Sequence, residues 1–469
     1  MQKIKQHPLI TGTIILTMTG LVSRLIGFFY RIYLSRLFGE EGMGIYQLIS
    51  PVLSLSFSLT AAGYQTAVSK LVAERTARQE KHTFKPLFAA LSISIPLSLL
   101  CNFIVYTFSE EIASILLLET RTAPMLRILS FSIPVAAVHS CINGYFYGIK
   151  KTGVPAATQL IEQCIRVGSV YGLSGYALAK NANLTINVAV LGLVVGEIGS
   201  MLVSLFSMYL VLYRAGHAHL KTAFQTVSFT RPMNSTASTG VYVPLLSMVL
   251  PLTANRIVLN LLQSLESVSI PAKLRLYGYD NATALSVYGV LTGMAMPLIF
   301  FPNALTNSVS VLLLPMISEA YALGDMEKVK KYTLQTVRFC ILLGFACMSV
   351  FLLTGRFIGG KLFNSKLAGH FILNLSFLCP FLYLDTTLSS ILQGLGMAGH
   401  IFVMNVISLL LRLAFVFHAI PKFGITGYLW GILASQILLS ILYLACLFCN
   451  RKRLDRNKRA NVVRSASGR

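Results

Sequence analysis

The chain has 469 residues, of which 55% are hydrophobic and only 12% are charged, and its formal net charge is +23. A soluble protein of this length carries about a quarter charged residues on the surface of two or three domains, so a cytosolic enzyme, a secreted disulfide scaffold and a disordered regulator are excluded. The basic residues are scattered between apolar runs, which excludes nucleic acid as a partner and indicates a polytopic membrane protein.

Twelve apolar stretches are long enough to cross a membrane, because about 20 helical residues span about 30 Å of hydrocarbon. They cover residues 10–34, 44–72, 84–108, 122–148, 155–179, 186–213, 241–270, 283–318, 332–354, 368–395, 399–420 and 424–450. The eighth contains Pro297, Pro302 and Pro315, and dividing it gives an alternative count of fourteen spans. Such breaks persist in a membrane only where protein or water satisfies the freed backbone groups.

The distribution of Lys and Arg predicts the orientation of these spans. If both termini are cytoplasmic, the inner segments hold more than twice as many basic residues as the outer loops. This asymmetry follows the positive-inside rule, and an even number of spans requires both termini on one side.

Two stretches of the sequence repeat each other. Gly148–Arg166 and Gly394–Arg412 each begin with Gly and end with Arg, with a second Gly and a side-chain amide at the same offsets. Less regularly, Ser23-Arg24 matches Asn255-Arg256. Chance similarity between apolar stretches is the alternative. A true repeat of six spans predicts two parallel halves with the substrate path between them.

The predicted fold is therefore an all-α polytopic membrane protein with two pseudo-symmetric six-helix lobes around a central cavity. We expect an N-terminal lobe at 1–214, a cytoplasmic linker at 215–240, a C-terminal lobe at 241–450 and a basic cytoplasmic tail at 451–469.

Ionisable residues at membrane depth are functional candidates, because each costs about 3 kcal/mol or more unless it is paired or faces water. The basic ones are Arg24, Arg31, Lys70, Arg127, Arg166, Arg256, Arg338 and Arg412, and the acidic ones are Glu162, Glu197, Glu266 and Asp385. Lys70, Arg127 and Arg338 lie near helix ends, from which their side chains can reach the headgroups. The surplus of positive charge predicts an anionic substrate.

Arginines form the centre of the predicted substrate site. Arg24 and Arg31 share one face of the first helix, and Arg256 occupies the corresponding place in the second half. Guanidinium groups suit phosphate or pyrophosphate, because their planar fork pairs two oxygens at once. The predicted substrate-binding residues are Arg24, Arg31, Arg256, Asn255, Gln263, Glu266, Gln159, Glu162, Arg166 and Arg412. Glu162 and Arg166 are equally compatible with a structural ion pair.

The sequence predicts no cofactor, no metal site and no catalytic residues. Cys446-x-x-Cys449 ends a hydrophobic helix without a second cysteine pair. His139 and His418 are isolated on apolar helices, where we expect them to form hydrogen bonds within the core.

Several motifs resemble the stage V sporulation protein B family. They are Ser23-Arg24-Leu-Ile-Gly27-Phe28, Gly44-Ile-Tyr46-Gln47-Leu, Ala67-Val-Ser69-Lys70-Leu-Val-Ala-Glu74, Gly144-Tyr-Phe-Tyr-Gly148, Gln159-Leu-Ile-Glu162-Gln163-Cys-Ile-Arg166, Pro315-Met-Ile-Ser-Glu319-Ala and Leu392-Gln-Gly-Leu-Gly396. That family belongs to the multidrug/oligosaccharidyl-lipid/polysaccharide exporter superfamily, together with lipid II flippases and O-antigen repeat-unit flippases.

The resemblance implies a non-enzymatic flippase that moves an undecaprenyl-pyrophosphate-linked sugar, such as a cell-wall or spore-cortex precursor or a polysaccharide repeat unit, across the bacterial cytoplasmic (plasma) membrane by alternating access. In related flippases, arginines of the first helix engage the pyrophosphate. Arg24 matches the first of these by motif, and Arg31 lies one residue beyond the second. The arginine that those flippases carry between Tyr and Pro is missing between Tyr288 and Pro297, and Arg256 is its candidate substitute.

The expected partners are a lipid-linked anionic substrate, membrane lipids, and a coupling ion or the membrane potential. Two other functions stay open at this point. An ion-coupled multidrug exporter of the same superfamily would need an acidic cavity. A membrane scaffold for envelope assembly would transport nothing and would tolerate loss of the arginines.

Overall fold

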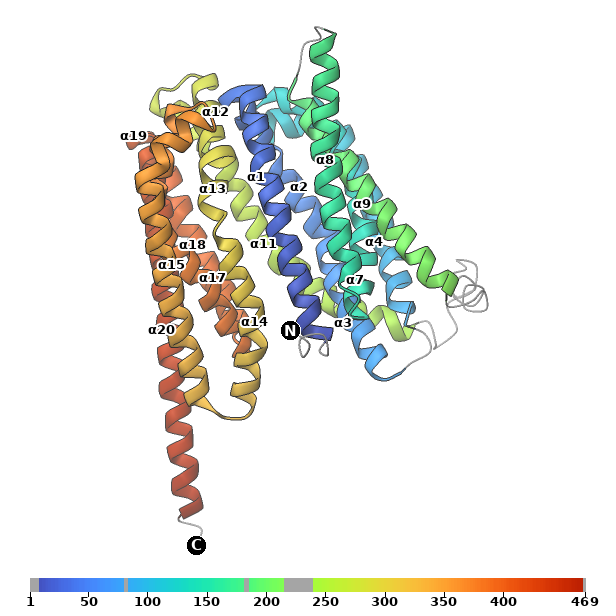
Figure 1. Cartoon of the computed structure of the whole chain (residues 1–469), viewed down its shortest axis with the longest axis vertical. Coiled ribbons are helices and arrows are strands. Elements are labelled where there is room, and N and C mark those ends of the chain that lie inside the picture. The colour runs from blue at the N-terminus through green and yellow to red at the C-terminus, as the bar shows by residue number, and fades with distance from the viewer. Residues whose placement is uncertain (1–7, 80–82, 181–184, 215–238, 467–469) are drawn as a thin grey trace. The chain divides into compact units, whose positions relative to one another are not determined.

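The computed structural model describes residues 8–79, 83–180, 185–214 and 239–466, and every regular element in these ranges is a helix (Figure 1). The predicted all-α class is thereby confirmed. The predicted linker at 215–240 lies outside the described residues except for its last two positions. Helix α20 (Ile425–Ala466) continues through most of the predicted basic tail.

The chain divides into two compact units. The first comprises Met1–Ala272 and Tyr279–Met294, and the second comprises Lys273–Gly278 and Ala295–Arg469. Most of α11 (Thr239–Tyr277) therefore belongs to the first unit. The division into lobes at 214 and 241 stays a prediction.

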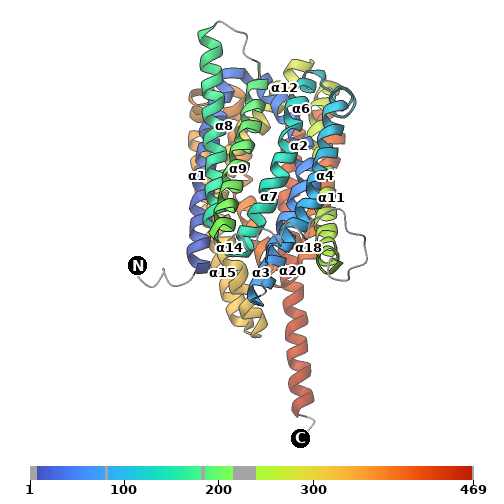
Figure 2. The ribbon, with the colours of Figure 1, turned by 90° about the vertical axis from the view of Figure 1, so that its right-hand side faces the viewer.

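Helices of the first unit surround a core formed around α7 (Ser132–Gly148), which packs against α3, α4 and α9, while α1 packs against α8 and α12 (Figure 2). The remaining helices are α1 (Pro8–Leu48), α2 (Ser50–Phe57), α3 (Gly63–Ala77), α4 (Lys85–Thr107), α5 (Ser109–Glu111), α6 (Ala123–Ser130), α8 (Gly153–Ala179), α9 (Asn187–Arg214) and α12 (Asn281–Gly289). Short π-helical segments (Ser58–Ala62, Ile112–Leu116 and Val290–Ala295) and a 3₁₀ turn (Thr120–Thr122) interrupt or join them.

The second unit packs α15 against α16 and α17, and α20 against α17 and α18. Its helices are α13 (Met296–Phe300), α14 (Asn303–Ala322), α15 (Met326–Lys361), α16 (Lys366–Ser376), α17 (Cys379–Gly394), α18 (Ala398–His418), α19 (Ile420–Phe423) and α20. The starts of α15 and α16 are set by the side chains of Asp325 and Ser365, which accept hydrogen bonds from the backbone N–H three residues on.

Prolines and one glycine explain where the long helices break. Gly39 adopts a φ of 70°, which kinks α1 and which a residue with a Cβ adopts only with strain. The predicted eighth span, 283–318, is divided among α12, α13 and α14, with Pro297 at the start of α13 and Pro302 directly before α14. The boundary between the two units falls in this interrupted region.

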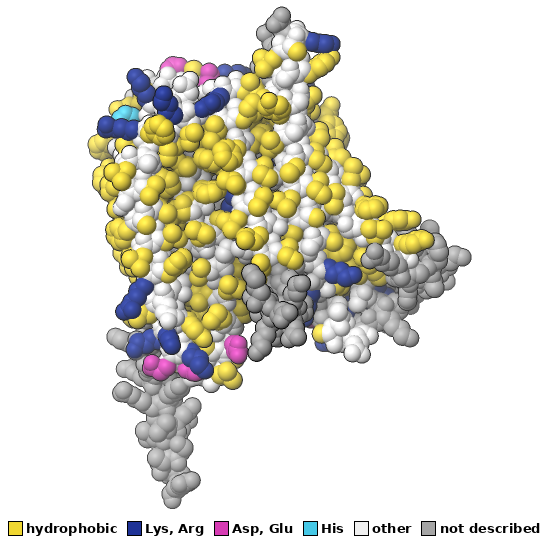
Figure 3. All heavy atoms as spheres, viewed as in Figure 1, with side chains coloured by type: hydrophobic (Ala, Val, Ile, Leu, Met, Phe, Trp, Pro, Cys, Tyr) yellow, Lys and Arg dark blue, Asp and Glu magenta, His cyan; other side chains and the backbone are white. Residues whose placement is uncertain are grey.

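Among the described residues, eight helical stretches are long and apolar enough to cross a membrane, and ten if two bent helix pairs each count as one span. The first stretch, Ile14–Ala77, has 64 residues, about three times the length that one crossing requires, and the Gly39 kink allows it to cross twice. Helix α8 has 27 residues and carries polar residues at 159–166, and it is not among these stretches. The count of twelve spans stays a prediction. Hydrophobic side chains cover the middle of the helices in Figure 3, while most Lys and Arg lie toward their ends.

Glycines bring α9 into close contact with α8. Gly192, Gly196 and Gly199 recur on the face of α9 that contacts α8. A Cβ at Gly192 would lie 2.1 Å from a methyl carbon of Val170, and one at Gly196 would lie 2.9 Å from the carbonyl oxygen of Glu162. Such small residues allow membrane helices to approach closely. This approach positions polar side chains of α8 and α9 against one another.

Candidate functional site

Four helices of the first unit bring charged side chains together in its interior. Arg31 comes from α1, His139 from α7, Glu162 and Arg166 from α8, and Glu197 from α9. We refer to these five residues as the ion network.

Two direct contacts hold the ion network. Nη2 of Arg166 contacts Oε1 of Glu162 one turn earlier on α8, and each side chain is only 17% exposed. Nε2 of His139 lies 2.6 Å from Oε2 of Glu197 in a hydrogen bond between α7 and α9. Arg31 lies within electrostatic range of Arg166, and Glu197 within range of both α8 residues. The ion pair between Glu162 and Arg166 that the sequence allowed is formed, and a substrate-binding role for either residue stays a prediction.

The formal charges of the ion network cancel when His139 is neutral, because the network contains two arginines and two glutamates. Burying a charge is costly unless an opposite charge and hydrogen bonds compensate it. Glu162 and Arg166 compensate each other directly, and Glu197 lies within electrostatic range of Arg166 and forms a hydrogen bond with His139, so these groups can remain ionised inside an apolar helix bundle.

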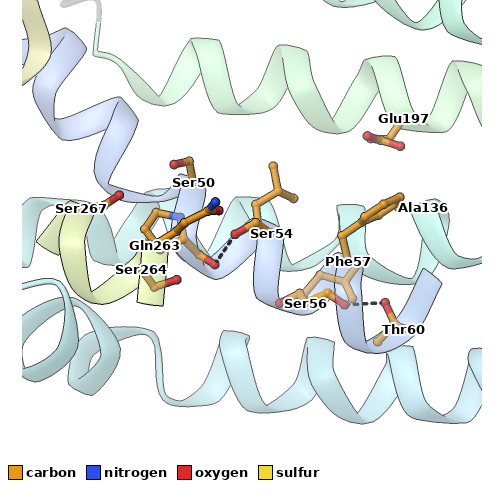
Figure 4. Close-up of a pocket in the computed structure, with 13 residues that line it drawn as sticks. Ser50, Ser54, Ser56, Phe57, Thr60, Ala136, Glu197, Gln263, Ser264 and Ser267 are labelled. Atoms are coloured by element: carbon orange, nitrogen blue, oxygen red, sulfur yellow. Dashed lines mark hydrogen bonds between the residues drawn. The ribbon is translucent and has the colours of Figure 1, made fainter. Parts of the chain in front are cut away.

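A cavity of about 470 Å³ lies beside the ion network within the first unit (Figure 4). Helices α2, α7, α9 and α11 and the π-helical segment after α2 contribute its walls, and Glu197 is its one ionisable residue. Its polar residues are Ser50, Ser54, Ser56, Thr60, Glu197, Gln263, Ser264 and Ser267, and its apolar ones are Pro51, Leu53, Phe57, Ile133 and Ala136. Asn260 joins α11 to α2 and to the π-helical segment after it, because its Nδ2 donates to the Ser54 carbonyl oxygen at 3.3 Å and to Oγ of Ser58 at 2.6 Å.

Arg24 and Arg256, the arginines on which the sequence prediction centres, are both exposed. Arg256 donates a long hydrogen bond of 3.5 Å to Oγ1 of Thr66, and among the described residues neither arginine forms a salt bridge. Asn255 beside it is also exposed. These residues lie in the same compact unit as the ion network, although Arg256 comes from the second half of the sequence.

The other predicted site residues are distributed unequally. Gln263 lines the cavity, whereas Glu266, one turn further along α11, is buried. Gln159 is exposed on α8, outside both the cavity and the contacts of the ion network. Arg412 is half-buried on α18 and belongs to the second unit. Binding roles for all of these residues stay predictions.

Sequence reasoning missed the pairing of His139 with Glu197 and the serine-rich wall of α2. His139 does form a hydrogen bond in the interior, but it is not isolated, since its partner lies on α9. Two ionisable residues at membrane depth on different helices were the available signal. Among the described residues, no group of three or more His, Cys, Asp or Glu side chains is placed to hold a metal ion.

The sequence of this chain is similar to two family models and to individual proteins of Bacillus subtilis. The family model for polysaccharide biosynthesis proteins matches residues 9–321, and the MatE family model matches residues 257–418. Stage V sporulation protein B of Bacillus subtilis strain 168 is 30% identical over 440 residues, covering 92% of this chain and 82% of the relative. Lipid II flippase MurJ of the same strain is 24% identical over 426 residues, covering 86% and 76%.

Among solved structures, the inward-facing conformation of a multidrug resistance MATE family transporter of the MOP superfamily aligns with a TM-score of 0.66 at 16% identity. The alignment covers 93% of this chain and 96% of that one. At this identity the similarity shows the fold alone, and it confirms the predicted class, an all-α, multi-pass membrane protein with two helical lobes.

Proposed function

We propose that this chain, which belongs to the polysaccharide biosynthesis protein family, is a flippase for an undecaprenyl-pyrophosphate-linked sugar. It moves this anionic lipid from the inner to the outer leaflet of the bacterial cytoplasmic membrane by alternating access, with both of its own termini in the cytoplasm. One relative is named a lipid II flippase and another a sporulation protein, which supports a cell-wall or spore-cortex precursor as cargo.

The observation that carries this proposal is the pair Arg24 and Arg256. Arg24 lies near the middle of the 41-residue α1, and Arg256 lies near the middle of the 39-residue α11. Both are exposed and, among the described residues, neither has a carboxylate partner. An unpaired guanidinium facing lipid at this depth would cost about 3 kcal/mol or more. The two side chains therefore face water, where an anionic group can replace the missing carboxylates.

The chemistry required of these residues is binding rather than catalysis. Each guanidinium can donate two parallel hydrogen bonds to a pyrophosphate, which compensates the charge of the lipid head as it passes the bilayer centre. No covalent bond is made or broken, because the lipid leaves the protein as it entered and its tail stays in the bilayer.

The test is rescue of a bacterium depleted of its own lipid II flippase. We expect the wild-type chain to restore growth, and Arg24→Ala or Arg256→Ala to abolish the rescue at unchanged protein levels. Arg24→Lys keeps the charge without the fork and should rescue only partly. Arg338→Ala is the matched control, because Arg338 is an exposed arginine of α15 near the start of the predicted span 332–354. Full activity of both alanine variants would refute the site.

Export of cationic drugs is a second candidate, supported by Glu197 as the one ionisable residue lining the cavity and by the MatE match over 257–418. It predicts that the chain lowers the drug susceptibility of a host and that Glu197→Gln removes this effect. Unchanged drug susceptibility, together with rescue of the flippase-depleted strain, would exclude it.

A further inference from the structure

Several hydroxyl groups that line the cavity donate their hydrogen to a backbone carbonyl oxygen in the preceding turn of helix. Ser54 donates to the Pro51 carbonyl oxygen at 3.0 Å, and Thr60 donates to that of Ser56 at 2.8 Å (Figure 4). Ser264 likewise donates to the Asn260 carbonyl oxygen at 2.6 Å. A hydroxyl has one hydrogen and two lone pairs. The hydroxyl oxygens of these residues therefore act as hydrogen-bond acceptors toward a ligand in the cavity.

Glu197 strengthens this acceptor character. A carboxylate accepts hydrogen bonds and donates none, and one of its oxygens already contacts His139. A wall of hydroxyl acceptors with one negative charge repels a phosphate, so the pyrophosphate bound by Arg24 and Arg256 is not the occupant. Pro51, Phe57 and Ile133 add apolar surface, against which C–H groups of a ligand can pack.

We propose that this cavity binds a sugar ring of the lipid-linked substrate, an uncharged group that carries many hydroxyl donors. The proposal rests on the proposed flippase function. It assigns the pyrophosphate and the sugar of the substrate to two different places in the protein. The arginines hold the pyrophosphate, while Ser54, Ser264 and Glu197 accept hydrogen bonds from the sugar hydroxyls. The volume of about 470 Å³ lies within the range of about 300–1,000 Å³ that small-molecule sites occupy.

The spacing along α11 agrees with this division. Arg256 and Gln263 are seven residues apart, so they share a helix face and are separated by roughly 10 Å along the axis. A pyrophosphate at Arg256 would thus be followed by its sugar near Gln263, whose amide can both donate and accept. Asn260 lies between them and holds α11 against α2, which makes it a positioning residue for the two acceptor-bearing walls.

The test compares two lipids that share the undecaprenyl tail and the pyrophosphate, of which only one carries a sugar-containing head. Equilibrium binding of lipid II and of bare undecaprenyl pyrophosphate is measured for the full chain in lipid nanodiscs. We expect the wild type to prefer lipid II, and the double variant Ser54→Ala/Ser264→Ala to bind lipid II about tenfold more weakly, as for the loss of about one to two net hydrogen bonds. Binding of the bare lipid should not change.

Ser247→Ala is the matched control. Ser247 lies on α11, as Ser264 does, and its hydroxyl also donates to a backbone carbonyl oxygen, that of Pro244 at 3.0 Å. Its side chain, however, is exposed and does not line the cavity. This variant should bind both lipids as the wild type does. Equal weakening of both lipids by the double variant, no weakening of either, or no wild-type preference for lipid II would overturn the proposal.

Two further arms separate failure of this proposal from failure of the flippase function. The free disaccharide chitobiose carries no phosphate, and its contact with the protein is followed by saturation-transfer NMR. Contact that depends on Ser54 and Ser264, without binding of either lipid, would support the cavity and refute the flippase. Contact of tetraphenylphosphonium that is lost in Glu197→Gln, together with no contact of chitobiose in the wild type, would identify a cation site and overturn the sugar assignment.

Discussion

Arg24 and Arg31 lie seven residues apart on one helix, yet the structure gives them opposite surroundings. Arg24 is exposed and has no carboxylate partner among the described residues. Arg31 is half-buried, and the charged side chain that lies within range of it is Arg166 of the ion network. A similar contrast separates Arg256, which donates a hydrogen bond to a threonine hydroxyl and forms no salt bridge among the described residues, from Arg166, which is paired with Glu162.

This difference teaches that charge at membrane depth serves two purposes in one compact unit. A paired arginine stabilises the helix packing around it, because its charge is compensated inside the protein. An unpaired one keeps its charge available for a ligand and requires water in front of it. The comparison therefore predicts that the two kinds of arginine fail in different assays.

The largest effect on stability is expected for Arg166→Ala. This change leaves Glu162 as a buried carboxylate without its partner, which costs about 3–5 kcal/mol of unfolding free energy. Arg24→Ala, which removes transport in our proposal, should leave stability within about 0.5 kcal/mol of the wild type. Heat unfolding of the purified variants in detergent measures both.

The double variant Glu162→Gln/Arg166→Met sharpens this prediction. Replacing a buried ion pair by uncharged groups of similar volume is often neutral or stabilising, so it should recover most of the loss seen in Arg166→Ala. A double variant as unstable as the single one would show that Arg166 acts through contacts other than Glu162. If Arg24→Ala is also unstable, Arg24 and Arg166 do not differ in their contribution to stability, which would contradict the prediction.

The sequence predicted the membrane class, because apolar length is a property of single stretches, while the substrate roles of the candidate charges stay predictions. It also placed Gln263 among the substrate residues, and the structure puts it in the cavity wall. It could not assign partners, because the contact of His139 with Glu197 joins residues 58 positions apart. Helical spacing suggested equal roles for Arg24 and Arg31, because it places both residues on one face of the helix. It does not show which side chains of other helices lie next to each residue.

The close contact between α8 and α9 gives the next prediction. Gly192→Ala places a Cβ 2.1 Å from a methyl carbon of Val170, which is fully buried and cannot yield easily. Overpacking of this kind costs about 1–3 kcal/mol, and it would also displace α9, which carries Glu197, from α8. The midpoint temperature of heat unfolding should fall accordingly.

Gly168→Ala is the control on α8, because a Cβ there meets nothing within 4 Å. Alanine is favoured over glycine in a helix by up to about 1 kcal/mol, so this variant should be as stable as the wild type or slightly more stable. If both glycine variants behave alike, the close approach of α9 does not stabilise the ion network.

The smallest expected effect concerns a charged group outside the membrane-spanning segments, and it contrasts with the buried ion network. Glu119 accepts hydrogen bonds from Nε of Arg121 at 2.7 Å and from Nδ2 of Asn281 at 2.9 Å, which joins the turn before α6 to the start of α12. Burial raises the pKa of Glu119, but the hydrogen bonds from Arg121 and Asn281 outweigh it and lower the pKa below its ordinary value.

A carboxyl group whose pKa is lower in the folded than in the unfolded state stabilises the fold above the unfolded pKa, and the contribution is lost as the pH falls through the folded pKa. The midpoint temperature should therefore decrease between about pH 5 and pH 3, and Glu119→Gln should reduce that decrease. Glu110→Gln is the matched control, because Glu110 pairs with Arg127 at 2.6 Å but is 73% exposed, and exposed pairs contribute little. If the midpoint temperature falls equally in the wild type and in Glu119→Gln as the pH is lowered, the contacts of Glu119 do not stabilise the fold, in contrast to those of the ion network.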